Sequence, residues 1–322
     1  NVLLIAVQQW QQAEVDTWIP EVRALEARLR GVAEARCLRG GLSGLLRRHL
    51  PRGVVYLNLG HSNFSARVLT AVRSVRDARV AVFLHDTIPL DHPSLQRPES
   101  VPRFASHLAR AGNADVILTS SRSAAGDIRR HLPDAPHIAV APLGLTRPAF
   151  GPADLPEQAR AAGTYFVALG TLEPRKNIGL LLDVWERLDT PPKLFLVGAR
   201  GWESAAFFAR LDAGIPGVTE LHDLPDAAAT ALVAGARALL FPSLAEGYGL
   251  PPLEAAALGT RPVCADLPVC RELLGDDGIY VPTDDVYAWV NTIRQLTEQN
   301  APMAPAIPPR WADHFKVTLT VA

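Results

Sequence analysis

The sequence predicts an α/β fold with two doubly wound domains, each built on a parallel sheet. Short apolar runs of strand length alternate with stretches of helical spacing, which is typical of a parallel sheet with helices on both faces. The alternation occurs twice, and the proline-rich segment 146–157 between the two series is typical of an interdomain linker. The 322 residues, 48% of them hydrophobic, are enough for two such domains. We therefore expect one domain at residues 1–148 and a second at 149–308.

In the first half, apolar runs predict the strands of one sheet. Helices are expected at 21–30, where Val22, Leu25 and Leu29 share one face, and at 124–131. The expected strands are residues 2–7, 54–59, 79–84, 114–119 and 138–140.

Polar side chains follow several of these strands, and ligands of such sheets bind beyond the carboxyl ends of the strands. A lone histidine is usually structural, but several polar strand ends on one sheet edge favour a binding site. We expect His85 to be the main contact from the first domain. The other candidates on this side are His61, Asp86, Ser120 and Arg122.

The second half repeats the pattern and ends in a short tail. The tail, 309–322, contains a helical stretch at 311–317 that is expected to cross back to the first domain. The expected strands are 165–169, 193–198, 218–221, 238–241, 261–265 and 278–282, and the expected helices are 178–188, 227–236, 253–258 and 285–295.

Residues 170–177, GTLEPRKN, follow the first strand of the second half. Gly170 and Thr171 place open backbone at the strand end, and Arg175 and Lys176 precede the expected helix. Two cations beside the positive end of a helix favour an anion such as a diphosphate. An isolated Arg-Lys pair is more often a solvated basic turn, so the pair alone does not establish the site.

Residues 241–257, FPSLAEGYGLPPLEAAA, predict a strand end, a loop and a helix that begins near two prolines. Gly247 and Gly249 allow a ligand to approach the backbone closely. Glu246 and Glu254 flank the loop, and carboxylates accept hydrogen bonds from sugar hydroxyls. Two glutamates alone would equally fit an ordinary solvated turn.

Composition and charge exclude some classes of protein. The 32 Lys and Arg nearly balance the 33 Asp and Glu, so no basic excess indicates nucleic acid. The three cysteines fit neither a disulfide framework nor a metal spacing, and a reducing cytoplasm is the expected location. No apolar run is long enough to span a bilayer. No metal site and no cofactor is expected.

Residues 23–52 contain eight arginines and only two acidic residues. A solvated helix face beside a core stripe explains such a segment in most proteins. The functional interpretation is a patch for anionic lipid or for a lipid phosphate, which would hold the protein at the inner face of the membrane.

Several complete strings resemble one enzyme family. EGYGLPPLEA at 246–255 resembles the E-x7-E signature of retaining glycosyltransferases of family 4, and GTLEPRKN at 170–177 resembles their donor-phosphate loop. LHDTIPLDHP at 84–93 resembles a segment of a mannosyltransferase-like subset. SSRSAAGDI at 120–128 and PLGL at 142–145 are similar to further turns of the family. The resemblance covers roughly residues 80–320 and is most specific at 170–260.

The resemblance implies a glycosyltransferase-B architecture, with two domains facing across a cleft. It implies metal-independent transfer of a hexose, with retention, from a nucleotide diphosphate sugar to a glycan or lipid-linked saccharide in bacterial-type polysaccharide synthesis. A mannose-like sugar and GDP-mannose are favoured. Catalytic roles fall to Arg175, Lys176, Glu246 and His85. Donor binding falls to Gly170, Thr171, Gly198, Leu224, Gly247, Tyr248, Gly249, Leu250 and Glu254, with Leu224 and Gly198 at the nucleobase and Glu254 at the ribose.

One departure leaves alternatives open. Relatives carry a glycine-rich loop after the first strand, whereas here QQWQQAEVD follows Val7 and no glycine occurs before Gly31. A non-catalytic nucleotide-sugar-binding protein of the same fold is therefore the alternative. A nicotinamide dehydrogenase would also use doubly wound domains, but no G-x-G-x-x-G follows any expected strand.

Overall fold

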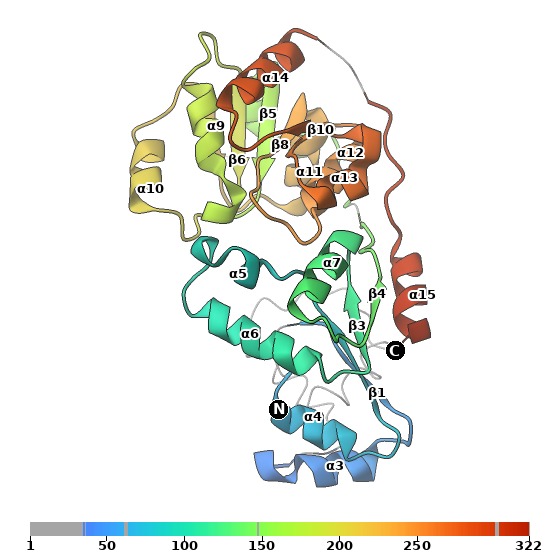
Figure 1. Ribbon diagram of the computed structural model, residues 1–322. Helices are drawn as coiled ribbons and strands as arrows, with labels where there is room; N and C mark the ends of the chain where they lie inside the picture. Colours follow the sequence, from blue (N-terminus) through green and yellow to red (C-terminus); the bar gives the residue numbers. More distant parts are fainter. Residues whose placement is uncertain (1–34, 36, 61–63, 147, 300–302, 322) are drawn as a thin grey trace.

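The computed structural model describes residues 35, 37–60, 64–146, 148–299 and 303–321, and shows two α/β domains with parallel sheets (Figure 1). This confirms the predicted fold class. The predicted strand at 2–7, the predicted helix at 21–30 and His61 lie outside the described residues. No helix in the described ranges combines the length and the apolar character that a bilayer-spanning helix needs.

The first domain contains four parallel strands in the order β1-β2-β3-β4. The strands are β1 (Val55–Asn58), β2 (Arg79–Phe83), β3 (Val116–Thr119) and β4 (His137–Val140). The two faces of the sheet bury different side chains, because neighbours along a strand point to opposite sides. On β2, Val80 and Val82 pack into the main core of this domain, whereas Ala81 and Phe83 face a second, smaller cluster.

Helices of the first domain surround this sheet, and two of them reach the boundary with the second domain. They are α3 (Leu42–His49), α4 (Ala66–Arg73), α5 (Ile88–Asp91), α6 (Ser100–Ala111) and α7 (Arg122–His131). In Figure 1, α5 and α7 lie next to the second domain, and α6 runs below α5. Helix α7 begins two residues before the expected start, since the Ser121 hydroxyl caps it by accepting the N–H of Ala124.

The second domain contains six parallel strands in the order β10-β9-β8-β5-β6-β7. They are β5 (Tyr165–Leu169), β6 (Lys193–Val197), β7 (Val218–Leu221), β8 (Ala238–Phe241), β9 (Arg261–Ala265) and β10 (Ile279–Val281). Chain order reverses between β5 and β8, and in open sheets of this kind the crevice at the carboxyl ends of such a pair binds ligands. The loops that follow β5 and β8 are 170–177 and 242–249, the two strings that sequence patterns select.

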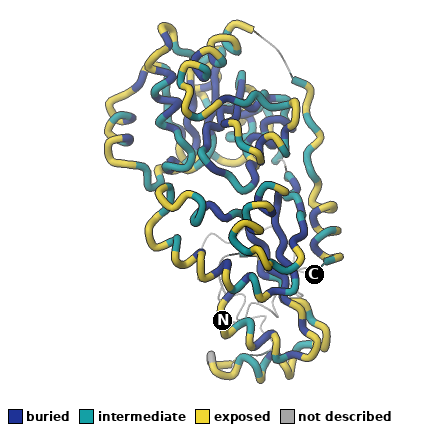
Figure 2. Tube along the Cα trace, in the orientation of Figure 1, coloured by how far each residue is buried: buried dark blue, intermediate teal, exposed yellow. Residues whose placement is uncertain are grey.

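Two cores cover the two faces of this sheet, and buried residues concentrate in the strands of both domains (Figure 2). Trp185 and Trp289 are fully buried in the first of these cores. The surrounding helices are α8 (Glu157–Arg160), α9 (Ile178–Trp185), α10 (Ala205–Asp212), α11 (Asp226–Gly235), α12 (Leu250–Leu258), α13 (Pro268–Leu274) and α14 (Val286–Glu298).

Three predicted helix boundaries were wrong by three residues. Helix α12 begins at Leu250 rather than at Leu253, because Pro251 and Pro252 occupy its first turn, where a missing N–H costs nothing. Helix α9 ends at Trp185 rather than at Leu188, and α14 continues to Glu298 rather than ending at Gln295.

The last helix, α15 (Trp311–Val321), lies beside β4 of the first domain (Figure 1). Val317 and Val321 pack on the cluster formed by the outer face of the first sheet. His314 is buried, and its Nδ1 lies 3.0 Å from the carbonyl oxygen of Ala141. The chain thus crosses between the domains a second time, and this crossing is tied to the first where the N–H of Leu145 donates to the Pro309 carbonyl at 3.1 Å.

Candidate active site

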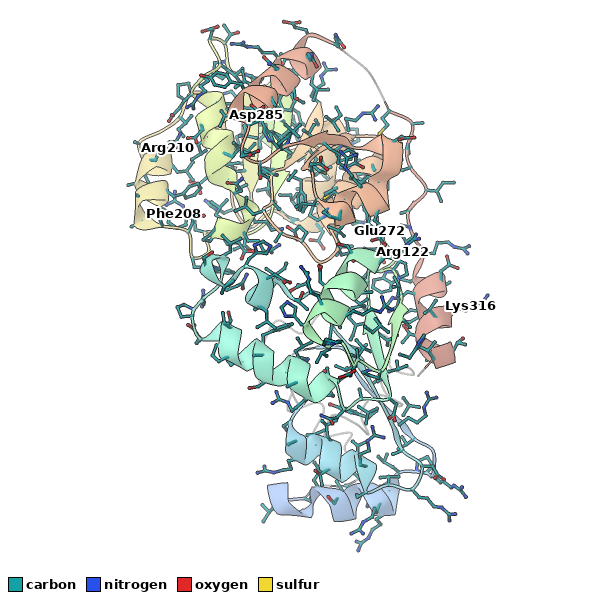
Figure 3. The ribbon with its side chains drawn as sticks, in the orientation of Figure 1. Arg122, Phe208, Arg210, Glu272, Asp285 and Lys316 are labelled. Atoms are coloured by element: carbon teal, nitrogen blue, oxygen red, sulfur yellow. The ribbon has the colours of Figure 1, made fainter. Side chains whose placement is uncertain are left out.

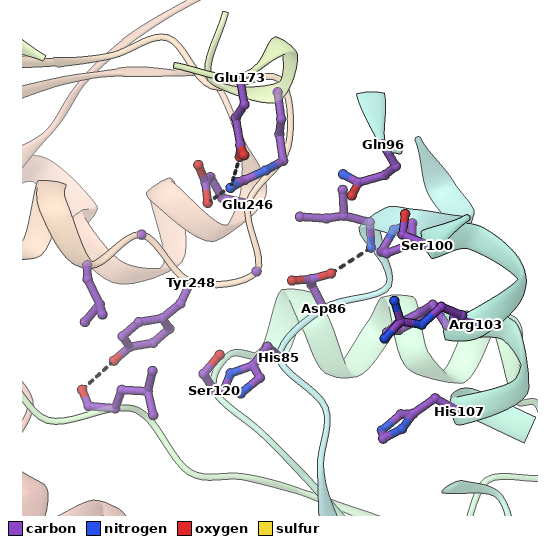
Figure 4. Close-up of a pocket in the computed structure, with 18 of the residues that line it drawn as sticks. His85, Asp86, Gln96, Ser100, Arg103, His107, Ser120, Glu173, Glu246 and Tyr248 are labelled. Atoms are coloured by element: carbon purple, nitrogen blue, oxygen red, sulfur yellow. Dashed lines mark hydrogen bonds and ion pairs between the residues drawn. The ribbon is translucent and has the colours of Figure 1, made fainter. Parts of the chain in front are cut away.

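A cavity of about 750 Å³ lies between the two domains (Figure 4). The first domain contributes the loop after β2, the face of α6 and the end of β3. The second domain contributes Glu173 and Arg175 from the loop after β5, Trp202, and residues 246–251 from the loop after β8 and the start of α12. The cavity therefore opens at the strand ends where a ligand site is expected.

Glu246 holds two cations at the second domain's side of this cavity. Its Oε2 lies 2.6 Å from Nη1 of Arg175, and its Oε1 lies 2.8 Å from Nζ of Lys176. The Glu246 side chain is only 9% exposed, so these charges interact through a poorly solvated environment. The structure thus brings Glu246 to a pair of cations from which 70 positions of sequence separate it, counted from Lys176.

Local backbone structure places the two cations. A 3-10 turn, Pro174–Lys176, follows Glu173, and Asn177 then adopts the left-handed conformation, with φ of 52°, before α9 begins. The side-chain amide of Asn177 donates through Nδ2 to the Pro242 carbonyl at 3.3 Å. The N–H of Leu244 donates to the Arg175 carbonyl at 2.8 Å, so the loops after β5 and β8 are joined directly.

Arg175 keeps its charge despite its burial. Burial would lower the pKa of its guanidinium, but the charges and hydrogen bonds of Glu246 and Glu173 outweigh that effect and raise the pKa. Nη2 donates to Glu173 at 2.7 Å, and Nη1 donates to the Ala245 carbonyl at 3.0 Å. Glu173 was not selected from the sequence, although it stands two residues before Arg175.

Two glycines allow the ends of β5 and β6 to approach each other. Gly170 and Gly198 have φ of 142° and 143°, and a Cβ on Gly198 would lie 2.3 Å from the Gly170 carbonyl oxygen. A Cβ on Gly170 would lie 3.3 Å from Cε of Lys176. Gly170, Gly198 and the exposed Thr171 lie outside the lining of the 750 Å³ cavity.

Glu254 and Leu224 lie farther along the second domain and also do not line the cavity. Burial, with a smaller contribution from the charge of Asp226, raises the pKa of Glu254. Asp226 begins α11 directly after Leu224 and Pro225, and α11 contacts α12, the helix that carries Glu254. His222 closes the loop before α11 onto Gly198, whose carbonyl oxygen lies 2.9 Å from the histidine Nδ1.

On the first domain's side, His85, Asp86 and Ser120 line the cavity. The Ser120 side chain is 1% exposed, and its hydroxyl has no hydrogen-bond partner among the described residues. Oδ1 of Asp86 accepts the N–H of Ile88 at 3.0 Å. Gly247 packs on this loop so closely that a Cβ there would lie 2.4 Å from the His85 carbonyl oxygen.

Arg122 does not line the cavity, although the sequence predicts it to be a contact from the first domain. Its side chain is 85% exposed and its Nε lies 3.5 Å from Glu272 of α13 (Figure 3). The backbone N–H groups of Arg122 and Ser123 donate to the same carboxylate at 2.8 and 2.9 Å. The strand end was identified correctly, but the arginine begins α7 and points toward the second domain outside the pocket.

Sequence patterns also missed one wall of the cavity. Helix α6 contributes Ser100, Arg103, His107 and Arg110, and the second domain contributes Trp202. The only signal in the sequence was the spacing of 3, 4 and 3 residues, which places the four α6 side chains on one helix face. That pattern is equally typical of a solvated helix.

Comparisons with known proteins agree with this geometry. Residues 163–299 match the family described as glycosyl transferases group 1. The chain is 30% identical over 267 residues to the serotype-specific mannosyltransferase WbdA of Escherichia coli, an alignment that covers 73% of this chain and 32% of that protein. It is 36% identical over 130 residues to the O-antigen chain mannosyltransferase B of Escherichia coli, covering 38% of this chain and 34% of that protein. The chain spans about a third of the length of these curated relatives.

Solved structures show the same fold at low identity. HepE of Anabaena, in complex with UDP, aligns with a TM-score of 0.65 and 16% identity, covering 88% of this chain and 76% of that chain. Sucrose-phosphate synthase from Thermosynechococcus elongatus aligns with a TM-score of 0.61 and 21% identity, covering 89% and 73%. The two parallel-sheet domains therefore have the glycosyltransferase-B fold, and residues 163–299 form a domain of the glycosyl transferases group 1 family.

Proposed function

We propose that this chain transfers a hexose from a nucleotide diphosphate sugar to a glycan or lipid-linked saccharide in bacterial-type polysaccharide synthesis. The observation that carries the proposal is the cluster of Glu246, Arg175 and Lys176 at the point where strand order reverses. The mannosyltransferase names of the relatives support a mannose-like sugar and, with it, GDP-mannose as donor.

Arg175 and Lys176 stabilise the diphosphate as its bond to the sugar breaks. Lys176 donates one of its three N–H groups to Glu246, which leaves two for phosphate oxygens. In the absence of donor, Glu173 and Glu246 balance the two cations, so the site does not hold uncompensated buried charge. When a diphosphate binds Lys176, the fixed charge of the lysine takes the place of water at the leaving group.

Glu246 holds the hydroxyls of the transferred sugar, and the backbone of Gly247, Tyr248, Gly249 and Leu250 surrounds it. Tyr248 is fixed for this purpose, since its hydroxyl donates to the Leu143 carbonyl at 2.9 Å. His85 contacts the sugar from the opposite domain, and Asp86 and Ser120 help to place the acceptor. The bond between the anomeric carbon and the diphosphate oxygen breaks, and the acceptor oxygen bonds to that carbon from the same face, so the configuration is retained. The leaving phosphate oxygen takes the acceptor proton, and the transfer is metal-independent.

The proposal includes a cytoplasmic location with peripheral contact to the membrane through segment 23–52. Of this segment the structure describes residue 35 and residues 37–52, where α3 exposes Arg47 and Arg48 while burying Leu46. An amphipathic helix with this exposed pair supports contact with anionic lipid.

The test is sugar transfer from a panel of GDP-, UDP- and dTDP-sugars by the wild type and by Lys176→Ala and Glu246→Gln. We expect either substitution to lower turnover by about 100-fold or more, because Lys176→Ala removes a cation at the diphosphate and Glu246→Gln removes the charged acceptor of the sugar hydroxyls. Lys193→Ala, which changes an exposed lysine at the start of β6, is the matched control and should keep full activity.

Thermal unfolding of each variant separates lost chemistry from lost folding. Nuclear magnetic resonance of the product gives its anomeric configuration, and an inverted product would refute the retaining mechanism. A wild-type protein that binds nucleotide sugars without turning any over would instead support the non-catalytic binding protein.

A further inference from the structure

One face of α6 forms a polar and basic wall of the cavity that the donor does not need. Ser100, Arg103, His107 and Arg110 follow one another at spacings of 3, 4 and 3 residues and all line the pocket. Figure 4 shows Arg103 and His107 on the side of the pocket opposite Tyr248 and Glu246. A ligand that reaches this wall extends away from the cluster of Glu246, Arg175 and Lys176 in the second domain.

Arg103 differs from the other arginines of the cavity because it has no polar partner among the described residues. Arg175 is held by Glu246 and Glu173, and Nε of Arg110 donates to the Phe64 carbonyl at 2.7 Å. Arg103 makes no hydrogen bond or ion pair with any residue in the described ranges. Arg103 is exposed and lines the cavity, so no described residue occupies any of its five N–H groups.

The distribution of charge around the cavity is uneven. Glu173 and Glu246 balance Arg175 and Lys176, so the cluster of the second domain is neutral. Lys176 does not itself line the cavity. The charged lining residues of the first domain are Arg103, Arg110 and Asp86, which leave one positive charge in excess on that domain's side. This excess favours an acceptor that carries a negative group.

Trp202 adds a surface for a saccharide at the same cavity. It comes from the loop after β6 of the second domain, and the guanidinium of Arg97 lies 4.9 Å from the centre of its ring. Its Nε1 is buried and has no hydrogen-bond partner among the described residues. An indole face packs well on a sugar ring.

We propose that the α6 wall binds an oxyanion carried by the acceptor saccharide, with Arg103 as its bidentate anchor. A guanidinium matches the geometry of phosphate and carboxylate equally well. The oxyanion therefore has two chemical sources, a phosphate or diphosphate ester that links the saccharide to a lipid, or the carboxylate of an acidic sugar. The inference rests on the proposed function and makes the acceptor class of that same site specific.

The experiment compares three acceptors that share one saccharide. The first is a neutral alkyl glycoside, the second has the alkyl group attached through a diphosphate, and the third is a neutral glycoside with an added uronic acid. Transfer to each is measured for the wild type, Arg103→Ala and Arg103→Lys. The control is Arg129→Ala, which changes an exposed arginine on α7 that does not line the cavity.

We expect Arg103→Ala to raise the acceptor KM about 10- to 100-fold for one of the two charged acceptors, the size of a lost charged hydrogen-bond pair. The KM for the donor and for the neutral acceptor should change less than 2-fold. Arg103→Lys should restore part of the loss, because the charge returns without the planar fork. The charged acceptor that responds identifies the source of the oxyanion.

Calorimetric titration of the same acceptors, with nucleoside diphosphate present, tests the anchor without turnover. The wild type should bind one charged acceptor more tightly than the neutral one, and Arg103→Ala should abolish that difference. Equal losses for charged and neutral acceptors, or no change in either measurement, would overturn the inference. A protein that binds the charged acceptor through Arg103 but transfers no sugar would instead refute the proposed function.

Discussion

At the residue scale, Glu246 has the largest influence on the cavity. Its carboxylate is 9% exposed, and the Lys176 and Arg175 side chains that it pairs with are 14% and 18% exposed. Removing one partner of such a pair leaves a charge without compensation in a poorly solvated place. The glutamine variant of Glu246 also removes the charge, but it keeps the side-chain volume and one acceptor oxygen, so it adds no cavity to that effect.

Glu254 gives a prediction that combines stability with ligand binding. Its pKa is raised in the folded protein, first by burial and then by the charge of Asp226. A raised carboxyl pKa gives stability that is full below the unfolded pKa and is lost as pH rises through the folded pKa. We therefore expect Glu254→Gln to melt at a higher temperature than the wild type at pH 8, with a smaller difference at pH 5.

The same substitution should weaken nucleotide binding if Glu254 accepts the ribose hydroxyls. Loss of one charged hydrogen bond corresponds to about 10-fold in affinity, which titration with GDP and UDP measures. Glu298→Gln, at an exposed position of α14, is the control for both measurements. A Glu254→Gln protein that is less stable at pH 8, or that binds nucleotide unchanged, would contradict this prediction.

At the element scale, most of the fold could be predicted from the sequence because buried parallel strands are continuous apolar runs. The expected strands of the second domain match β5 to β10 within one residue at each end. Two contiguous strings, 170–177 and 242–249, could be placed at the cavity for a related reason, since each directly follows one of these strands. Helix ends such as those of α9 and α14 were less accurate, because packing rather than local sequence decides the last turn.

The α6 wall could not be predicted in this way. Serine, histidine and arginine on one helix face are typical of contact with water, and only the arrival of Trp202 and the loop after β8 turns that face into a cavity wall. Arg122, by contrast, is a residue that the sequence selects but that does not line the cavity. It stands at a strand end, but the first turn of α7 directs it to Glu272 rather than into the pocket.

Gly247 gives a prediction about how the loop after β8 meets the first domain. A Cβ at this position would lie 2.4 Å from the His85 carbonyl oxygen and 2.8 Å from Cβ of Asp86. Since backbone atoms cannot move aside cheaply, Gly247→Ala should force the two domains apart at the cavity. We expect transfer activity to fall at least 10-fold, measured under saturating donor.

The matched control for this substitution is Gly179→Ala. Gly179 lies in α9, and a Cβ there meets nothing within 4 Å. Replacing a helical glycine by alanine should stabilise the protein by about 0.5–1 kcal/mol and leave transfer unchanged. Full activity in the Gly247→Ala protein would mean that the close contact between the domains is not needed for turnover.

At the scale of the whole molecule, a few polar contacts hold the two domains together around the cavity. Glu272 of α13 accepts the first two N–H groups of α7, which are free helix donors of the first domain. The Ser121 hydroxyl donates to the Gly247 carbonyl at 2.9 Å. Each of these hydrogen bonds joins a donor of the first domain to an acceptor of the second, so each one breaks when the cleft opens.

We predict that Glu272→Ala shifts the protein toward an open arrangement. Loss of the charged acceptor at the start of α7 should cost the closed form about 1–2 kcal/mol, which is a 5- to 30-fold change in the ratio of closed to open molecules. Small-angle scattering should show a larger radius of gyration. Amide exchange should be faster at Arg122 and Ser123.

Glu298→Ala should leave the scattering and the exchange rates unchanged. If Glu272→Ala gave the wild-type scattering curve, other contacts would be sufficient to keep the cleft closed, and Glu272 would act only on the local stability of α7.

The return of the chain to the first domain has a mechanical consequence. The two segments that cross between the domains are joined at residues 145–146 and 309–311. The N–H of Leu145 donates to the Pro309 carbonyl, and Nε1 of Trp311, the first residue of α15, donates to the Thr146 hydroxyl at 3.0 Å. Two joined crossings at one edge of the molecule form a hinge, because they resist sliding and twisting of the domains but permit rotation about their common axis. Domains that separate about this edge return to the same register, so closure restores the same close contact between Gly247 and the His85 carbonyl.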